Sequence, residues 1–486
     1  MATCAAVPDV LVIGGGIAAL CAAITARRAG ASVQLLEWAP RALRGGNARH
    51  ARNLRAVHGA PTPFSPGVYT QAEFLAELSR VAEERDDPAL CQRLVADSVS
   101  VVPWLAAHGV GFQHAGDGLL PVSRRTSFLF GGGKTMLNAL YASAGRLGVQ
   151  IAYNSPVTGL TLADGRVRAL DLASSRVQPR AVVLCCGGAQ ADPASLRPLW
   201  GEAADAFVLR GTPYADGALL RGLIAQGVAT AGEPGACHLV AVDARSPRAD
   251  GGIATRVLGI PAGIVVDRAG RRFHDEGGDT GPTRYAVWGR KVAEQPGQMA
   301  WLILDAAAHS GTLPPVFPPL TAVTLQELAA LAGVDAAGLT ATVTAFNAAV
   351  REDGRTAGLV PGKTRHARAL TVPPFAAIPI RPGITFTCLG VKVDAGARVL
   401  MEDGTPVSNL FAAGMIMAPN VLGTGYLAGA GLTIGAVFGR LAGDSAARHA
   451  RCAADRRCDR RPEGRSGVQV SEARVNGEGQ ADHERF

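Results

Sequence analysis

The stretch Val10-Leu-Val-Ile-Gly14-Gly15-Gly16-Ile17-Ala18-Ala19 decides the fold. Its first four residues are typical of a short buried parallel strand, and the three glycines that follow predict a tight turn. A helix is expected over residues 17–28. The chain then passes through Ala-Gly into Ser32-Val-Gln-Leu-Leu-Glu37, which has the pattern of a second strand. Residues 9–37 therefore predict one strand–helix–strand unit of a parallel sheet.

The glycine turn has the spacing of a dinucleotide-binding fingerprint, Gly14-x-Gly16-x-x-Ala19, with alanine in third place. Glycines at these positions let backbone N–H groups approach a pyrophosphate at the positive end of the helix. Glu37 closes the next strand about 20 residues after the turn, where a carboxylate can accept hydrogen bonds from a ribose. The pattern favours a dinucleotide site. An ordinary glycine-rich turn of an unrelated α/β protein is the alternative.

The composition fits a large α/β enzyme. Of the 486 residues, 60 are glycine, hydrophobic residues make up 48% and aromatic residues 5%, which suits many tight strand-to-helix turns. A chain of this length exceeds one compact core, so we expect two connected domains. The net charge is +8, but the basic residues are scattered and no arginine stripe alternates with aromatic residues. This pattern argues against nucleic acid and favours small anionic partners.

Cysteine usage indicates a reducing compartment. The nine cysteines are an odd number and are scattered along the chain, and no pair of CxxC motifs is present. We therefore expect a cytoplasmic protein with no metal site and no iron–sulfur cluster of its own. No signal-peptide pattern and no bilayer-length apolar stretch is visible, so the protein is expected to be soluble or to dock to a membrane through a partner.

Two later segments distinguish FAD from NAD. Ala181-Val-Val-Leu-Cys-Cys-Gly187-Gly188 and Asn409-Leu-Phe-Ala-Ala-Gly414 are apolar strands that end in glycine. Both resemble the additional nucleotide-contact strands of FAD-dependent oxidoreductases. Residues 9–445 as a whole resemble the fumarate reductase and succinate dehydrogenase flavoprotein superfamily. The resemblance implies an α/β fold in which a Rossmann-like FAD-binding domain is interrupted by an α+β capping domain, with substrate at their seam.

The changes in composition along the chain agree with an FAD-binding domain that is interrupted by a capping domain. Mixed short helices and proline-rich turns begin at Gly211, and the apolar glycine-rich pattern returns near residue 375. We expect the first part of the FAD-binding domain over residues 1–210, the capping domain over 211–372 and the rest of the FAD-binding domain over 373–448. Residues 449–486 have almost no apolar periodicity and predict a disordered tail.

Within the first domain, residues 71–108 have a helical pattern. Residues 148–151 and 158–172 resemble strands of a smaller sheet, and Asp164-Gly165 is a hairpin turn signal between two of these strands.

The resemblance implies that FAD lies along the glycine turn and its neighbours. No histidine stands at Gly45-Gly46-Asn47, where membrane succinate dehydrogenases carry a covalent histidine linkage, so non-covalent FAD is expected. Many relatives have glutamate where this chain has Met415, so one hydrogen bond to the flavin is expected to be lost. A helix beginning near Ala430 is expected to direct N–H groups at the flavin. The expected cofactor contacts are Gly14, Gly15, Gly16, Ile17, Ala18, Ala19, Glu37, Gly45, Gly46, Asn47, Gly187, Gly188, Gly414, Gly431 and Leu432.

A closer resemblance, to the FAD-dependent tricarballylate dehydrogenases, is carried by the string Arg44-Gly-Gly-Asn-Ala-Arg-His-Ala-Arg-Asn-Leu-Arg55. These enzymes oxidise propane-1,2,3-tricarboxylate to cis-aconitate. The resemblance implies hydride transfer to flavin N5, proton transfer to an arginine relay of the cap, and electron transfer to a separate iron–sulfur or haem protein, either free or membrane-bound. The other matching segments are 131–134, 237–245, 271–276, 283–286, 381–387 and 420–429.

The resemblance also implies catalytic residues. Arg284 best matches the proton-transfer arginine of the superfamily. Arginine is a poor base at neutral pH because its pKa lies above about 12, so Glu276 and Asp279 are expected to relay the proton. His238 and Tyr426 complete the expected catalytic group. A satisfied core histidine is the alternative for His238.

Carboxylate recognition departs from the family pattern. Soluble fumarate reductases use a histidine and an arginine at positions that match Phe386 and Tyr426 here, so both charges are missing. Recognition must come from other residues. Arg271 and Arg272 are expected on the solvated face of a hairpin. The expected substrate-binding residues are Arg245, Arg290, Arg381, Thr387, Arg125 and His50.

Other functions stay open. Tyr426 before a glycine-rich helix start resembles the ketosteroid Δ1-dehydrogenases, in which a tyrosine polarises a carbonyl, so the chain could act on a keto-steroid. A fumarate reductase-like enzyme, the flavoprotein portion of a cobalamin-pathway precorrin oxygenase and a non-catalytic FAD-binding subunit are further alternatives. The abundance of arginine in the expected cap favours an anionic substrate.

Overall fold

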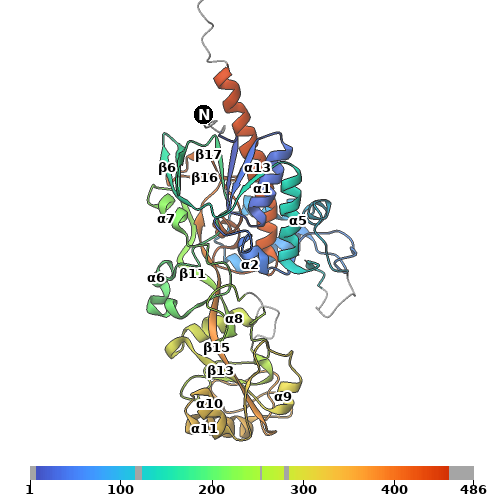
Figure 1. The fold of residues 1–486 in the computed structure, drawn as a ribbon. Helices are drawn as coiled ribbons and strands as arrows, with labels where there is room; N and C mark the ends of the chain where they lie inside the picture. The colour runs from blue at the N-terminus through green and yellow to red at the C-terminus, as the bar shows by residue number, and fades with distance from the viewer. Residues whose placement is uncertain (1–6, 115–122, 252–253, 279–283, 459–486) are drawn as a thin grey trace, which may run out of the picture.

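The computed structural model describes residues 7–114, 123–251, 254–278 and 284–458, with only the backbone at 284–285 and 454–458. Figure 1 shows an elongated molecule of two lobes. Two long strands, β11 (Thr230–Asp243) and β15 (Phe375–Val391), pair antiparallel and run between the lobes. Residues of both lobes therefore meet beside these two strands.

A six-stranded sheet forms the centre of the first lobe. Its order is β16-β17-β9-β1-β2-β5, and every neighbouring pair is parallel except β16 with β17. Each of the four residues of strand β1 is at most 4% exposed, because the apolar side chains on both faces of the sheet are covered. The strands are β1 (Val10–Ile13), β2 (Val33–Leu36), β5 (Gln150–Ala152), β9 (Ala181–Leu184), β16 (Arg398–Leu400) and β17 (Pro406–Ala412).

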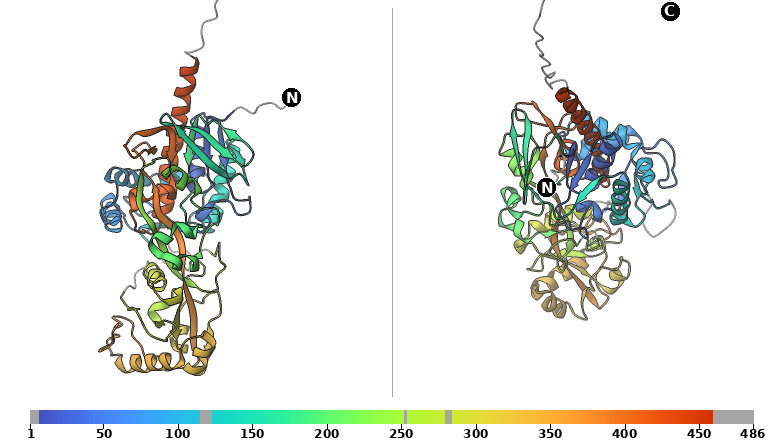
Figure 2. Two further views of the ribbon diagram at one scale, coloured as in Figure 1. Left: turned by 90° about the vertical axis from the view of Figure 1, so that its left-hand side faces the viewer. Right: turned by 45° about the horizontal axis from the view of Figure 1, so that its top comes forward.

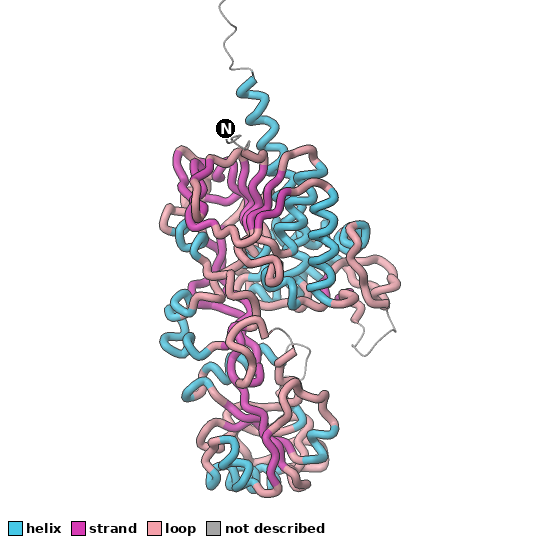
Figure 3. Tube along the Cα trace, in the orientation of Figure 1, coloured by secondary structure: helices cyan, strands magenta, loops and turns pink. Residues whose placement is uncertain are grey.

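Helices cover this sheet. Figures 2 and 3 show α1 (Ile17–Arg28), α5 (Gly132–Arg146) and α13 (Ala430–Cys458) running together beside the strands. The helices α1 and α13 approach closely where α13 has glycine. A Cβ at Gly439 would lie 2.5 Å from Ala18 O, and one at Gly443 would lie 2.3 Å from Ala22 O, so a larger residue would not fit. Small residues thus set this helix contact. The remaining helices of this lobe are α2 (Gln71–Ala82), α3 (Pro88–Ser98), α4 (Val101–Ala107), α7 (Ala218–Ile224) and α12 (Pro419–Leu422).

Smaller sheets flank the main one. The strands β6 (Val157–Ala163), β7 (Arg166–Leu172) and β8 (Arg176–Val177) form a three-stranded sheet, and β3 (Asn53–Arg55) pairs with β4 (Thr126–Phe128). The predicted hairpin turn is present: Asp164 and Gly165 both have left-handed backbone, at φ 50° and 64°. The strand expected over 148–151 belongs instead to the main sheet, where β5 pairs with β2.

The second lobe is built on a mixed sheet of order β10-β15-β13-β12, with β11 and β14 also paired to β15. Apolar residues such as Leu302 and Ile378 lie between this sheet and its helices. The other strands are β10 (Val208–Leu209), β12 (Ile264–Val266), β13 (Ala300–Leu304) and β14 (Leu320–Ala322). The helices of this part are α6 (Arg197–Trp200), α8 (Arg284–Ala293), α9 (Ala306–Ser310), α10 (Leu325–Ala332) and α11 (Ala336–Ala349).

The C-terminal boundary differs from the prediction. Disorder is expected from residue 449, but α13 continues through Cys458. Alanine and arginine, both good helix formers, dominate this segment, and Arg448 pairs with Asp444 one turn earlier. Residues 459–486 lie outside the described residues. In the described part of the chain, no helix combines the length and hydropathy that crossing a bilayer requires.

Candidate active site

A cavity of about 460 Å³ lies at the carboxyl ends of the parallel strands. Its wall includes Ile13 at the end of β1, Glu37 after β2, Gly187 after β9 and Gly414 after β17. The cavity continues to His238 on β11 and so reaches the second lobe. Ligands of open parallel sheets bind at this edge, because loops and helix N-termini converge there.

The glycine turn forms a cradle that no side chain fills. Gly14 has left-handed backbone at φ 113°, and a Cβ there would lie 2.4 Å from Cys185 O. Gly16 is the N-cap of α1 and supplies no side-chain hydrogen bond, and the first turn carries no acidic residue. The N–H groups at this helix end are therefore left for a ligand, and their positive dipole suits a pyrophosphate.

Glu37 approaches the same turn from β2. A Cβ at Gly15 would lie 1.9 Å from Glu37 Oε2 and 2.2 Å from the hydroxyl of Tyr141, so only glycine fits. The backbone N–H groups of Ala39 and Gly45 donate to the Glu37 carboxylate at 2.9 and 3.2 Å. Burial nevertheless raises the pKa of Glu37. The carboxylate lines the cavity, as expected for a ribose acceptor.

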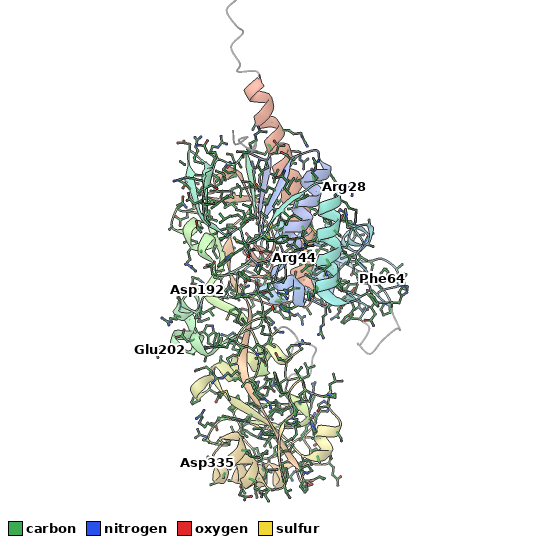
Figure 4. The ribbon with its side chains drawn as sticks, in the orientation of Figure 1. Arg28, Arg44, Phe64, Asp192, Glu202 and Asp335 are labelled. Carbon is green, nitrogen blue, oxygen red and sulfur yellow. The ribbon has the colours of Figure 1, made fainter. Side chains whose placement is uncertain are left out.

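A cation–aromatic contact closes the outer side of this turn. Arg44, labelled in Figure 4, lies with its guanidinium 4.5 Å from the ring centre of Tyr141. Tyr141 in turn donates a hydrogen bond to Gly15 O at 2.9 Å. The first residue of the Arg44–Arg55 string thus supports the glycine turn.

The 3-10 helix η1 (Gly46–His50) joins the two lobes beside the cavity. The side-chain carbonyl of Asn47 accepts from Thr212 N at 2.9 Å, and its amide donates to Thr385 O at 2.5 Å. A Cβ at Gly211 would lie 1.9 Å from Asn47 Oδ1. Asn47 therefore links η1 to the 211–212 turn and to Thr385 of β15.

The far end of the cavity contains a cluster of three rings. His238 stacks on Tyr426 and on Phe386, with ring centres 3.9 and 5.3 Å away and interplanar angles of 17° and 25°, and the centres of Phe386 and Tyr426 are 6.3 Å apart. Burial, together with the positive charges of Arg210 and Arg256, lowers the pKa of His238 to about 3. His238 is therefore neutral at physiological pH and supplies hydrogen bonding rather than charge.

Arg210 and Arg256 supply positive charge to this end. Both line the cavity, and Arg210 is only 7% exposed. Arg210 donates to Thr385 Oγ1 at 2.6 Å, and Arg256 is held by a bridge to Val242 of β11. Neither residue was predicted from the sequence. For Arg210, the local signal was its place directly after the short apolar run 207–209. Many surface strands share this pattern, so it did not single out a cavity residue.

Most predicted cofactor residues meet at the cavity. Ala19 and Gly188 do not line it: Ala19 is fully buried in α1, and Gly188 packs against Thr387 Oγ1. His50, His238 and Tyr426 do line it. The predicted cofactor residues on its wall are Gly14, Gly15, Gly16, Ile17, Ala18, Glu37, Gly45, Gly46, Asn47, Gly187, Gly414, Gly431 and Leu432.

Five predicted substrate residues lie elsewhere. Arg245 forms a bidentate pair with Asp243 and packs on Phe317. The Arg290 side chain is 68% exposed, and Arg125 pairs with Glu77 at 3.0 Å.

Two of the five belong to β15. Arg381 contacts Gly297 O at 3.4 Å. Thr387 is buried and accepts a hydrogen bond from Ala189 N at 2.9 Å. None of the five is on the cavity wall, because neighbours in the fold direct these side chains to other partners.

Of the predicted proton relay, the structure places only Glu276. Glu276 is fully buried and bonds Arg272 at 2.5 Å and Val265 N at 2.8 Å, away from the cavity wall. Arg272 is buried with it rather than solvated, whereas the Arg271 side chain is 72% exposed. The side chain of Arg284 and the whole of Asp279 lie outside the described residues.

The sequence matches the FAD binding domain family over residues 9–432. The chain belongs to this family. A probable fumarate reductase of Shewanella frigidimarina is 28% identical over 461 residues, which cover 91% of this chain and 75% of the relative. A fumarate reductase (cytochrome) of the same species is 26% identical over 91% of this chain and 77% of the relative. A 3-oxosteroid 1-dehydrogenase of Mycobacterium tuberculosis is 31% identical over 37% of this chain and 38% of the relative.

Solved structures confirm the predicted fold class. An open flavocytochrome c3 fumarate reductase superposes with a TM-score of 0.75 at 24% identity, over 91% of this chain and 78% of that chain. A ketosteroid Δ1-dehydrogenase of Sterolibacterium denitrificans superposes with a TM-score of 0.72 at 19% identity, over 91% of this chain and 99% of that chain. The protein is an FAD-dependent oxidoreductase of the class that acts on CH–CH groups.

Proposed function

We propose that this oxidoreductase acts on a carbon–carbon bond next to a carboxylate, in the manner of the fumarate reductases. The observation that carries the proposal is the pair Arg210 and Arg256, which line the cavity at the end where His238 and Tyr426 stand. Two guanidinium groups at one buried end suit an anionic substrate, because guanidinium binds carboxylate with charge-assisted hydrogen bonds. Tricarballylate, with its three carboxylates, is one member of this substrate class.

The residues of the chain divide the work. The glycine cradle and Glu37 would hold the pyrophosphate and ribose of FAD, which would supply hydride transfer when bound. Arg210 and Arg256 bind the carboxylate and stabilise negative charge that develops on it as the α-proton moves. The neutral ring of His238, held by its stacking partners, orients the substrate by hydrogen bonding. Arg284 stays the proposed proton-transfer residue of the cap.

A keto-steroid is the second candidate substrate. Tyr426 lines the cavity and stacks on His238, and Phe386 adds a further apolar ring. A tyrosine hydroxyl can polarise a carbonyl oxygen, and aromatic walls favour a steroid. One relative is named for an oxosteroid substrate, which supports the same candidate.

The substrate test compares the candidates directly. The FAD-loaded protein is mixed without oxygen with succinate, tricarballylate or a keto-steroid, and loss of oxidised-flavin absorbance near ~450 nm is followed. The dithionite-reduced protein is mixed with fumarate for the reverse reaction. We expect a carboxylate to change the flavin spectrum. A response to the keto-steroid alone would replace the carboxylate proposal with the second candidate.

The variant Arg256→Gln tests the cation itself. We expect the dissociation constant of the responding carboxylate to rise at least about tenfold, since one charge-assisted hydrogen bond is worth about 1.5–3 kcal/mol. Arg290→Gln is the matched control, because that arginine is exposed and off the cavity wall. Equal affinities in the two variants would remove Arg256 from carboxylate binding.

We also propose that FAD is bound without a covalent link. No histidine stands in residues 45–49, and the Nε2 atom of His50 is engaged by Asp250 at 2.5 Å. Acid precipitation should leave the flavin in the supernatant. Yellow colour in the washed pellet would show a covalent link.

The electron partner is proposed to be a separate iron–sulfur or haem protein in the cytoplasm or at a membrane.

A further inference from the structure

Two histidines line the cavity, and they differ in what surrounds them. His238 has only cations among the charged groups that act on it, and it stays neutral. His50, at the end of η1, has a carboxylate partner: its Nε2 lies 2.5 Å from Asp250 Oδ1. An adjacent carboxylate fixes the orientation of an imidazole and stabilises its protonated form. His50 is therefore the ring of the pair that can change its charge.

Asp250 occupies a prepared position behind His50. Its backbone is left-handed at φ 61°, its N–H donates to Gly211 O at 2.9 Å, and Arg49 lies 3.3 Å from its second carboxylate oxygen. The side chain of Asp250 is 28% exposed, while Asp250 itself is not on the cavity wall. The carboxylate thus stands between the cavity-lining ring and solvent.

We propose that His50 and Asp250 form a proton-transfer pair that connects the flavin cavity with solvent, with Asp250 as the positioning residue. The inference deepens the proposed function, because each oxidation of a CH–CH bond by hydride transfer leaves one proton to remove. In that step an α-C–H bond of the substrate breaks, and the proton passes from the proton-transfer residue of the cap to Nδ1 of His50, whose ring becomes an imidazolium beside Asp250. It later releases one proton to water. Reduction of a double bond uses the same pair in reverse.

The electrostatics of the pocket set the sense of the coupling. Burial lowers the pKa of His50, Asp250 opposes this, and Arg49 and Arg210 lower the pKa further. Reduction adds negative charge to the bound flavin, which favours the protonated ring. The protein should therefore bind one more proton when the flavin is reduced, over the pH range between the two pKa values of His50.

The test needs no substrate, so it is independent of the proposed function. The midpoint potential of the bound flavin is measured by spectroelectrochemistry from pH 5 to 9. Each extra proton taken up with an electron pair adds about 30 mV per pH unit to the slope, which is tenfold in the equilibrium constant. In the wild-type protein we expect a pH range in which the midpoint potential changes more steeply with pH. His50→Gln should remove it, and Asp250→Asn should move it to lower pH.

The controls separate the pair from a general charge effect. Asp164→Asn removes an exposed carboxylate that also pairs with an arginine, Arg168, and should keep the wild-type profile. A His50→Gln protein with the wild-type profile would overturn the proposal. Should a variant lose FAD, ¹⁵N spectra of histidine-labelled wild-type holoprotein decide: a His50 ring that does not gain a proton on flavin reduction overturns it equally.

Discussion

At the scale of single residues, the chemistry of the site depends on which charges reach the cavity. Arg210 and Arg256 are among the arginines that do so, and burial together with their positive charge keeps His238 neutral. Arg245, an arginine of the family-like string 237–245, is instead committed to Asp243. A residue type and a motif thus predict chemistry only after the partners of each side chain are known.

The low pKa of His238 predicts a pH-dependent stability. The folded pKa, about 3, lies below the ordinary value of 6.5, so the unfolded chain binds more protons between these values. The contribution is complete above pH 6.5 and is lost as the pH falls, by up to about 1.4 kcal/mol per pH unit.

His238→Phe keeps a ring in the stack and removes the titration. In urea unfolding with FAD present, the stability of wild type relative to this variant should fall from pH 7 to pH 5. The exposed His114 receives the same substitution as a control for the added phenyl ring. A stability difference that stays constant with pH would contradict the neutral buried state.

At the scale of elements, a buried ion pair holds the segment that leads into α8. Glu276 accepts from Arg272 and from Val265 N of β12, and both side chains are at most 5% exposed. Arg272 also donates to Pro361 O at 2.7 Å, so a distant segment is fixed by the same pair. The pair is a structural joint of the second lobe, and Glu276 lies off the cavity wall.

Glu276→Gln should therefore destabilise the FAD-free protein by about 3–5 kcal/mol, because Arg272 would keep an uncompensated buried charge. Thermal unfolding of FAD-free protein measures this, with Glu294→Gln as the exposed control. A relay residue would behave in the opposite way, with normal stability and slowed turnover.

At the scale of the whole molecule, FAD should bind between parts that η1 already connects. Asn47 bonds the 211–212 turn and β15 from its place on the glycine-rich side of the cavity. Ligand binding to the folded state alone stabilises by about 2.7 kcal/mol at a hundredfold excess over the dissociation constant. This stabilisation should extend to both lobes through the Asn47 contacts.

In Asn47→Ala we expect weaker FAD binding and a broader or divided calorimetric transition, with wild type unfolding in one step when FAD is saturating. Asn347→Ala, which removes the bonds of an asparagine remote from the cavity to Leu370, is the control. A single, unshifted holoprotein transition in Asn47→Ala would show that the lobes are coupled by other contacts.

The sequence by itself determined the parallel sheet, the glycine cradle and the acidic residue beside it, because these depend on local patterns: an apolar run, glycines at fixed spacing and a carboxylate one strand later. Strand β1 and helix α1 have the predicted bounds, β9 begins at Ala181 as predicted, and the predicted FAD-dependent oxidoreductase is confirmed. The apolar run, the glycines and Glu37 lie within about 30 residues of each other.

Only the tertiary structure decided which charged side chains face the cavity. Arg210 and Arg256, which line the cavity, and Asp250, which pairs with His50 behind the wall, come from short segments with no periodic signal and far along the chain from η1. Glu276 matched a family string, yet in the structure it forms an ion pair with the buried Arg272. Charge pairing acts over a few ångströms in space, so spacing in the sequence does not reveal it.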